Sequence, residues 1–177
     1  MKMMRTVVLT ISLLTAVLVP AQAQFDAVGS LDFPTSSSGD VEQHFLRGVA
    51  ILHSFGWVQA RDQFQEAQAL DPDFAMAYWG ETLCYNHPLF ATAPDNDNPR
   101  AVLRRLGATR EERLAKAPTE REKGFLNAVE TLWGDGDYDD RRVAYMEAMQ
   151  RLHQRYPDDH EVATFAAVAT LSAARAM

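Results

Sequence analysis

Residues 48–85, GVAILHSFGWVQARDQFQEAQALDPDFAMAYWGETLCY, carry the pattern that decides the fold of this chain. Apolar residues recur there at helical steps, and Phe55-Gly56-Trp57 and Asp71-Pro72-Asp73 interrupt them. Such steps align apolar side chains along one face of a helix, whereas a proline ends a helix and restricts the residue before it. The stretch therefore predicts helix, tight turn, helix, turn and helix. Gly56 is expected to take positive φ at the first turn, because glycine lacks a Cβ.

The small residues of this stretch lie where two helices have to touch. Ala60 and Ala67 flank Phe64 on one face of the second helix. A small side chain lets a facing backbone come close while a large one fills the groove between helices. This face is therefore expected to pack against the helix that contains Gly48.

The flanking regions are also expected to be helical, with short interruptions. Asp40 with Gln43, Thr109 with Glu112 and Thr119 with Glu122 each have the spacing of a capping box at a helix start. Prolines and glycines between the apolar patterns indicate where helices end. The helices expected from these signals cover residues 40–54, 57–70, 74–85, 98–106, 109–118, 119–133, 140–156 and 160–177.

The central stretch resembles the tetratricopeptide repeat (TPR) family, in which units of about 34 residues form antiparallel helix pairs. The residues that match the family's spacing are Gly48, Ala60, Phe64, Ala67 and Pro72. His44 and Arg47 stand where the family most often has Trp and Leu. The resemblance covers residues 40–85, is weaker over 119–177 and is absent between them. It implies an all-α fold of stacked antiparallel helix pairs, a TPR-like α-solenoid with an irregular insertion, and a role in protein–protein interaction.

The first residues have the composition of an export signal. A short basic segment, residues 1–5, precedes an apolar run over residues 6–19, and Ala21-Gln22-Ala23 supplies the small residues of a cleavage site. We expect cleavage after Ala23 and a periplasmic or secreted protein with no stable membrane anchor. The apolar run is shorter than the roughly 20 residues that cross a bilayer; an uncleaved membrane anchor is the alternative.

The expected organisation follows from these patterns. It comprises a signal peptide over 1–23, a flexible linker over 24–39, a helix pair with the first helix of the next repeat over 40–85, an irregular insertion with short helices over 86–118, and degenerate TPR-like helices over 119–177. Repeat arrays need a terminal unit with a polar outer face, and the last helix has no such partner in the sequence. We therefore expect an incomplete array, with the chain being a fragment or a partner covering that end.

The overall composition narrows the class of partner. The formal net charge of -7 gives no indication of nucleic acid or of an anionic membrane surface. Cys84 is the only cysteine, so it cannot form an internal disulfide, and it is expected to be a small buried hydrophobe.

A polar and aromatic cluster lies where the repeat pattern ends. Its members are His53, Trp57, Trp79, Glu81, Tyr85, Asn86 and His87. One interpretation is a pocket in a concave face that holds a peptide or a small ligand through hydrogen bonds and ring faces. The other is structural, with these side chains bonding the unpaired backbone of the long turn after Tyr85.

Metal chemistry has weaker support in the sequence. A site made of His53, Glu81 and His87 would need a further ligand, and no H-E-x-x-H motif or cysteine pair supplies it. Asp135, Asp137 and Asp139 have the spacing of a calcium loop, but non-matching residues stand where that loop requires Gly and Glu. No metal or cofactor is therefore assigned.

Positive charge concentrates in the inserted helices. The residues concerned are Arg100, Arg104, Arg105, Arg110 and Arg113. A solvated face and a docking patch for an acidic peptide are the two interpretations.

The sequence contains no catalytic constellation that we can identify. It has no phosphate-binding glycine loop and no nucleophile elbow. We expect a non-enzymatic exported scaffold that binds a protein or peptide partner. The alternative is a small-ligand or metal-dependent activity centred on His53, Glu81 and His87.

Overall fold

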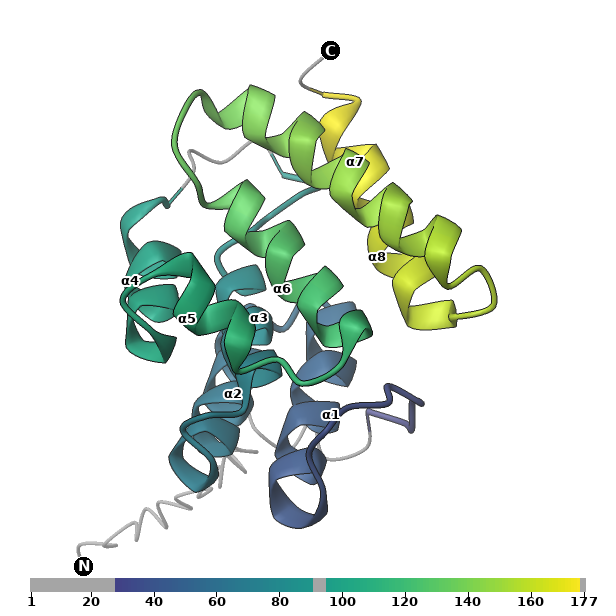
Figure 1. The fold of residues 1–177 in the computed structure, drawn as a ribbon. Coiled ribbons are helices and arrows are strands. Elements are labelled where there is room, and N and C mark those ends of the chain that lie inside the picture. Colours follow the sequence, from purple (N-terminus) through teal and green to yellow (C-terminus); the bar gives the residue numbers. More distant parts are fainter. Residues whose placement is uncertain (1–27, 91–94, 176–177) are drawn as a thin grey trace, which may run out of the picture.

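The computed structural model describes residues 28–90 and 95–175, and within them the chain is all-helical, with no strand. The helices, labelled in Figure 1, are α1 (Gly39–His53), α2 (Trp57–Leu70), α3 (Ala75–Leu83), α4 (Asp97–Leu106), α5 (Arg110–Ala115), α6 (Glu120–Leu132), α7 (Tyr138–Arg155) and α8 (His160–Ala173). The all-α prediction is confirmed. The expected signal peptide lies outside the described residues, and in the described part no helix is long and apolar enough to cross a membrane.

The helices pack largely in chain order. Contacts join α1 to α2, α2 to α3 and α3 to α4, and then α6 to α7 and α7 to α8. A further contact joins α3 to α6, so the insertion that holds α4 and α5 is bridged by direct packing between the helices on either side (Figure 1). Whether this arrangement is a TPR-like solenoid stays a prediction.

The predicted contact between α1 and α2 is confirmed and has a second half that the sequence analysis missed. A Cβ added at Gly48 of α1 would lie 2.7 Å from the ring of Phe64 on α2. A Cβ added at Gly80 of α3 would lie 2.3 Å from the same ring. Because neither separation leaves room for a side chain, Phe64 packs between two glycines on opposite neighbours, which holds the three helices together.

Two of the three predicted capping boxes are present. Thr109 with Glu112 and Thr119 with Glu122 each make both reciprocal hydrogen bonds. The predicted box at Asp40 is wrong, because α1 begins at Gly39 after Ser38, which is extended (φ -153, ψ 168) and makes no side-chain cap hydrogen bond. Since Asp40 already lies inside the helix, its side chain is not at the position from which a cap acts.

The turn between α1 and α2 also differs from the prediction. Phe55, not Gly56, takes positive φ, at 59°. The Phe55 N–H donates to the Leu52 carbonyl at 3.0 Å and the Gly56 N–H donates to the Ile51 carbonyl at 3.1 Å, which is the hydrogen-bond pattern of a Schellman motif. That pattern places the left-handed residue one position earlier than expected.

Residues 28–38, which we call the strap, form no regular element but are not a free linker. Phe33 is only 1% exposed and belongs to the main hydrophobic core. The backbone of the strap is tied to α6, where Arg121 donates to the Pro34 carbonyl at 2.9 Å. The expectation of a flexible linker over residues 24–39 therefore fails for residues 28–38, because an apolar side chain and long-range bonds hold them.

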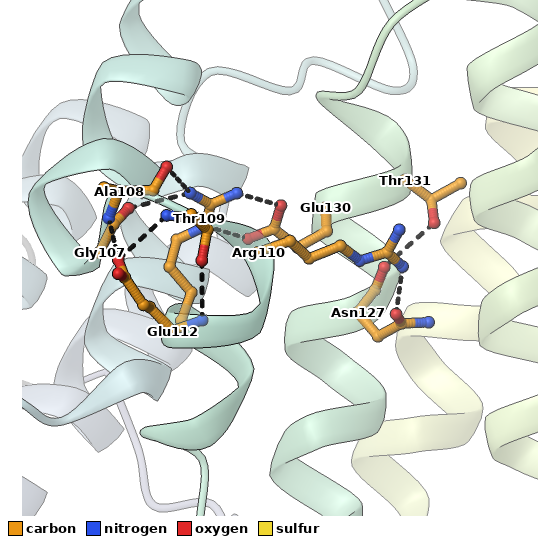
Figure 2. A network of polar contacts seen from close by, with 9 residues as sticks. Gly107, Ala108, Thr109, Arg110, Glu112, Asn127, Glu130 and Thr131 are labelled. Atoms are coloured by element: carbon orange, nitrogen blue, oxygen red, sulfur yellow. Dashed lines mark hydrogen bonds and ion pairs between the residues drawn. The ribbon is translucent and has the colours of Figure 1, made fainter.

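The arginines of the insertion mostly bond within the fold. Arg113 of α5 donates to Glu130 of α6 at 2.7 Å and to the Gly107 carbonyl at 2.9 Å. Figure 2 shows Arg110 reaching Asn127 beside this ion pair, so two guanidinium groups attach α5 to α6. Arg100 donates to the Trp133 carbonyl at 2.8 Å. These contacts favour a structural role for the positive charge over a docking patch.

The last helix is largely covered within the described residues. Its buried residues are Val162, Phe165, Ala166, Ala169, Ser172 and Ala173, and α8 packs against α7. Leu171, which is 57% exposed, is the large apolar side chain that stays open on this helix. Whether the array is incomplete at this end stays a prediction.

An ion pair between α6 and α8 predicts a pH dependence of stability. Arg121 donates to Asp159 at 2.6 and 3.1 Å, and Asp159 also accepts from the N–H of Val162 at 3.0 Å. Partial burial opposes ionisation, but the hydrogen bonds from Arg121 and from the Val162 N–H prevail and lower the pKa of Asp159. A lowered folded-state pKa adds stability above the ordinary aspartate pKa of about 3.9, and that stability is lost as pH falls through the folded value.

We expect Asp159→Asn to lower the free energy of unfolding by about 1–2 kcal/mol near neutral pH. Asparagine still caps α8, so the variant removes the charge and spares the cap. The difference between wild type and variant should begin to shrink below about pH 5 and should go on shrinking below the ordinary aspartate pKa of about 3.9, as the pH falls through the lower folded-state pKa. Urea denaturation across this range is the measurement. A difference that stays constant with pH would contradict the assignment.

Candidate binding site

Three residues of the cluster that the sequence indicated lie at one open cavity of about 180 Å³. His53, Trp57 and Asn86 line this cavity. The other lining residues are Leu52, Phe55, Leu83, Pro88, Tyr145, Thr164, Phe165 and Val168. We call this cavity the α1–α8 pocket, because its walls come from the end of α1, the start of α2, the segment after α3, and α7 and α8.

His53 forms one polar wall of the pocket. It lies in the last turn of α1, and its Nε2 is 2.8 Å from Oε2 of Glu161 on α8. Its ring centroid is 5.2 Å from that of Phe165. The carboxylate and the ring together fix the orientation of the imidazole, so His53 presents a defined edge to the pocket.

Phe55 and Trp57 line the pocket, and the rings of His87 and Phe90 pack against Trp57. The rings of Trp57 and His87 have centroids 4.2 Å apart, and Phe90 meets Trp57 edge-on at 5.5 Å. Phe55, whose centroid is 5.9 Å from that of Trp57, is 47% exposed, and Phe90 is 53% exposed. Exposed aromatic residues gathered beside a cavity are typical of a contact surface.

Asn86 supplies a second polar wall. The residue is 6% exposed, and its Oδ1 accepts from the Tyr138 hydroxyl at 3.4 Å. Its side-chain amide nitrogen has no hydrogen-bond partner among the residues that the structure describes. Burial raises the pKa of Tyr138, so its hydroxyl stays protonated as the donor. The Asn86 amide can therefore donate to a carbonyl group in the pocket.

Three other members of the predicted cluster lie elsewhere. Trp79 is fully buried, with its ring centroid 5.5 Å from that of Phe33 and 4.9 Å from that of Phe165. Glu81 is also fully buried in a hydrogen-bond network. Tyr85 lies under the guanidinium of Arg61, 5.8 Å from the ring centroid. These side chains take part in core packing, a buried polar network and a cation–π contact. These contacts differ from the bonds to the turn after Tyr85 that the structural interpretation expected.

The contacts of Glu81 also bear on the metal alternative. Its carboxylate accepts from Gln65 at 2.8 Å, from Gln68 at 2.6 Å and from Arg105. The α1–α8 pocket, which includes His53, does not include Glu81. Within the described residues, no group of three or more His, Cys, Asp or Glu side chains could hold a metal ion.

Two further features of the sequence have local structural explanations. Asp137, from the calcium-like series, accepts from the N–H of Asp139 at 2.8 Å and caps α7, while Asp139 pairs with Arg142 at 3.0 Å. Cys84 is 5% exposed, and burial strongly raises the pKa of its thiol. The Asp137 and Asp139 contacts give these carboxylates a structural role at the start of α7, and Cys84 is buried as expected.

The sequence analysis missed the half of the pocket that comes from α7 and α8. Tyr145, Thr164, Phe165 and Val168 reach the site only because α8 returns to the end of α1, and no local pattern indicates this. The exposure of Phe55 could have been predicted from the sequence, because this residue lies beside Gly56 in the predicted turn between two helices.

Comparison with known proteins found no match, so the functional assignment rests on the geometry of the chain. No family model matches it, and no curated protein and no solved structure matches it either.

Proposed function

We propose that this protein is a non-enzymatic helical scaffold that binds a protein or peptide partner by accepting an apolar or aromatic side chain in the α1–α8 pocket. The observation that carries the proposal is an open cavity lined by Trp57 and by the exposed ring of Phe55, with the exposed ring of Phe90 packed against Trp57. Buried aromatic anchors supply much of the energy of protein interfaces. The TPR-like helix pairs and the composition of residues 1–23 support an exported interaction module.

The size and chemistry of the pocket favour a single side chain over a whole small molecule. Its volume of about 180 Å³ is below the range of about 300–1,000 Å³ that is usual for ligand pockets. Its walls are mostly apolar, with His53 and Asn86 as the polar exceptions. We infer that a partner inserts one apolar side chain and accepts a hydrogen bond from Asn86 through a main-chain carbonyl.

The strained backbone of Phe55 supports the same proposal. A bulky residue with positive φ is uncommon, and such strain is concentrated at functional sites. Here the strained residue keeps its ring exposed at the pocket mouth. Glycine would adopt this φ without strain. The presence of phenylalanine instead indicates that its ring has a role at the pocket.

Peptide selection followed by pocket variants tests the proposal. Peptides of about a dozen residues would be selected from a display library on the immobilised full-length protein and measured by calorimetry. We expect them to carry a large apolar residue and to bind Thr164→Trp, which obstructs the pocket, at least about tenfold more weakly. Ala167→Trp is the matched control, because Ala167 is exposed on the same helix and does not line the pocket.

A second variant separates binding from stability. Phe55→Gly removes the ring and relieves the positive φ together, so it should weaken binding while leaving the free energy of unfolding unchanged or higher by about 1 kcal/mol. Equal affinity of the selected peptides for wild type and both pocket variants would refute the proposed site.

A further inference from the structure

The strap, drawn in purple before α1 in Figure 1, has the exposure pattern of a bound extended peptide. Asp32, Pro34, Ser36 and Ser38 are exposed, while the residues between them are buried or half-buried. Alternation of this kind arises when successive side chains of an extended chain point to opposite sides. The buried and half-buried side chains therefore face the helices, and of the exposed residues Ser36 still reaches α6 through its hydrogen bonds to Glu122.

The strap contributes one aromatic side chain to a cage that four helices build. The Phe33 centroid lies 5.1 Å from that of Phe45 on α1, 5.5 Å from Trp79 on α3 and 5.2 Å from Phe125 on α6. Phe165 of α8 is 6.5 Å away. We call the space between these four rings the strap groove.

Two charged residues at the start of α6 bind the strap backbone and one hydroxyl. Arg121 lies over the Phe33 ring, 4.3 Å from its centroid, and donates to the Pro34 carbonyl at 2.9 Å. Glu122 Oε1 accepts from both the N–H and the hydroxyl of Ser36 at 2.8 Å. These contacts recognise an aromatic residue, the main-chain carbonyl of the residue that follows it, and a serine three residues after the aromatic residue.

The residues that bind the strap are held in place by the helices themselves. The second oxygen of Glu122 accepts from the Thr119 hydroxyl at 2.8 Å in the capping box of α6. Arg121 is oriented by its ion pair with Asp159, at 2.6 Å. Both groups therefore keep their positions without the strap, as the binding residues of a preformed peptide site would.

The strap itself is attached lightly for a buried segment. Within the described residues, its backbone makes no hydrogen bond to another backbone group. It is held by the Phe33 ring, by the partly buried side chains of Val28 and Leu31, and by Arg121 and Glu122. Segments with few backbone bonds open more readily than the helices around them.

From these observations we propose that the strap groove is a binding site for an extended segment of a partner protein with the pattern Phe-x-x-Ser. The strap occupies this site in the same chain until a partner segment displaces it. The strap groove and the α1–α8 pocket share the Phe165 ring but are otherwise lined by different residues. The inference therefore does not depend on binding at the α1–α8 pocket.

Hydrogen exchange on the full-length wild-type protein tests whether the strap opens by itself. The Ser36 N–H, which donates to Glu122, reports on strap docking, and the amides of α3 report on global unfolding. We expect the Ser36 amide to exchange at least about tenfold faster, after correction for intrinsic rates, and with little dependence on urea. Exchange of Ser36 only through global unfolding would overturn the proposal.

A peptide added in trans tests recognition. A labelled peptide with the sequence of residues 31–38 should bind the full-length Phe33→Ala variant at least about tenfold more tightly than it binds wild type, whose groove is filled. The same peptide with alanine in place of its phenylalanine is the control and should bind neither protein. Fluorescence anisotropy measures both.

The peptide measurements and the hydrogen-exchange experiment together decide the outcome. Equal binding of the two peptides, or no binding to the Phe33→Ala variant, would overturn the proposal. If that variant does not fold, the hydrogen-exchange experiment on wild type still decides. The double variant Phe33→Ala/Thr164→Trp should bind the strap peptide as tightly as Phe33→Ala alone. A negative result for the proposed α1–α8 pocket can therefore be distinguished from a negative result for the strap groove.

Discussion

Replacement of Phe33 by alanine is expected to lower the free energy of unfolding by about 3 kcal/mol. The ring is 1% exposed and meets aromatic rings from α1, α3, α6 and α8. Its removal leaves a cavity that these four helices cannot close, because each ring is already fixed by its own helix. Urea denaturation followed by far-ultraviolet circular dichroism is the measurement.

Phe90→Ala is the matched control for this prediction. It deletes the same ring from a position that is 53% exposed, so its effect on stability should stay within about 0.5 kcal/mol. A Phe33→Ala loss as small as that of Phe90→Ala would mean that residues 28–38 behave as the free linker expected from sequence composition. Because the strap can undock while the helices stay folded, the loss should not exceed the free energy of strap opening measured by hydrogen exchange.

Arg105→Ala is expected to destabilise the protein by about 2 kcal/mol. This is less than the cost of breaking a fully buried ion pair, because the Arg105 side chain is 49% exposed and water can partly replace it. Glu81 is fully buried, and Arg105 is the cation that its carboxylate contacts. Removal of the guanidinium leaves a buried negative charge whose remaining donors, among the residues that the structure describes, are the amides of Gln65 and Gln68. An uncompensated buried charge is costly even though the pair itself contributes little net stability.

Two further variants make this prediction specific. Arg104→Ala removes the same charge from the neighbouring exposed position and should change stability by no more than about 0.5 kcal/mol. Adding Glu81→Gln to Arg105→Ala removes the stranded charge and should recover more than half of the loss. Equal effects of Arg104→Ala and Arg105→Ala, or no recovery in the double variant, would contradict the assigned network.

The features that could be predicted from the sequence depend on nearby residues. The bounds of α2, the two capping boxes at Thr109 and Thr119 and the contact of Phe64 with Gly48 were all predicted correctly. Each depends on helical periodicity or on a hydrogen bond across a few residues. The position of positive φ at Phe55 was missed because it depends on where α1 ends, and helix ends are less sharply encoded.

The candidate site was predicted only in part, because burial depends on what covers a helix. Every residue of α3 is buried, since α1, α2, α4 and α6 all contact this helix. Trp79 and Glu81 therefore entered the core instead of a groove. His53, Trp57 and Asn86 remained at a cavity because they lie at or near helix ends, where the packing of helices leaves space.

The sequence by itself determined that this protein is helical, where most helices begin and end, and how α1 and α2 touch. Only the tertiary structure decided that the strap is part of the core, that Glu81 is paired inside the protein and that α8 completes a pocket. The bonds responsible join distant residues, with Ser36 and Glu122 separated by 86 positions and His53 and Glu161 by 108. Local periodicity acts over a few residues, whereas the partner of a buried charge or ring is set by which helices pack together.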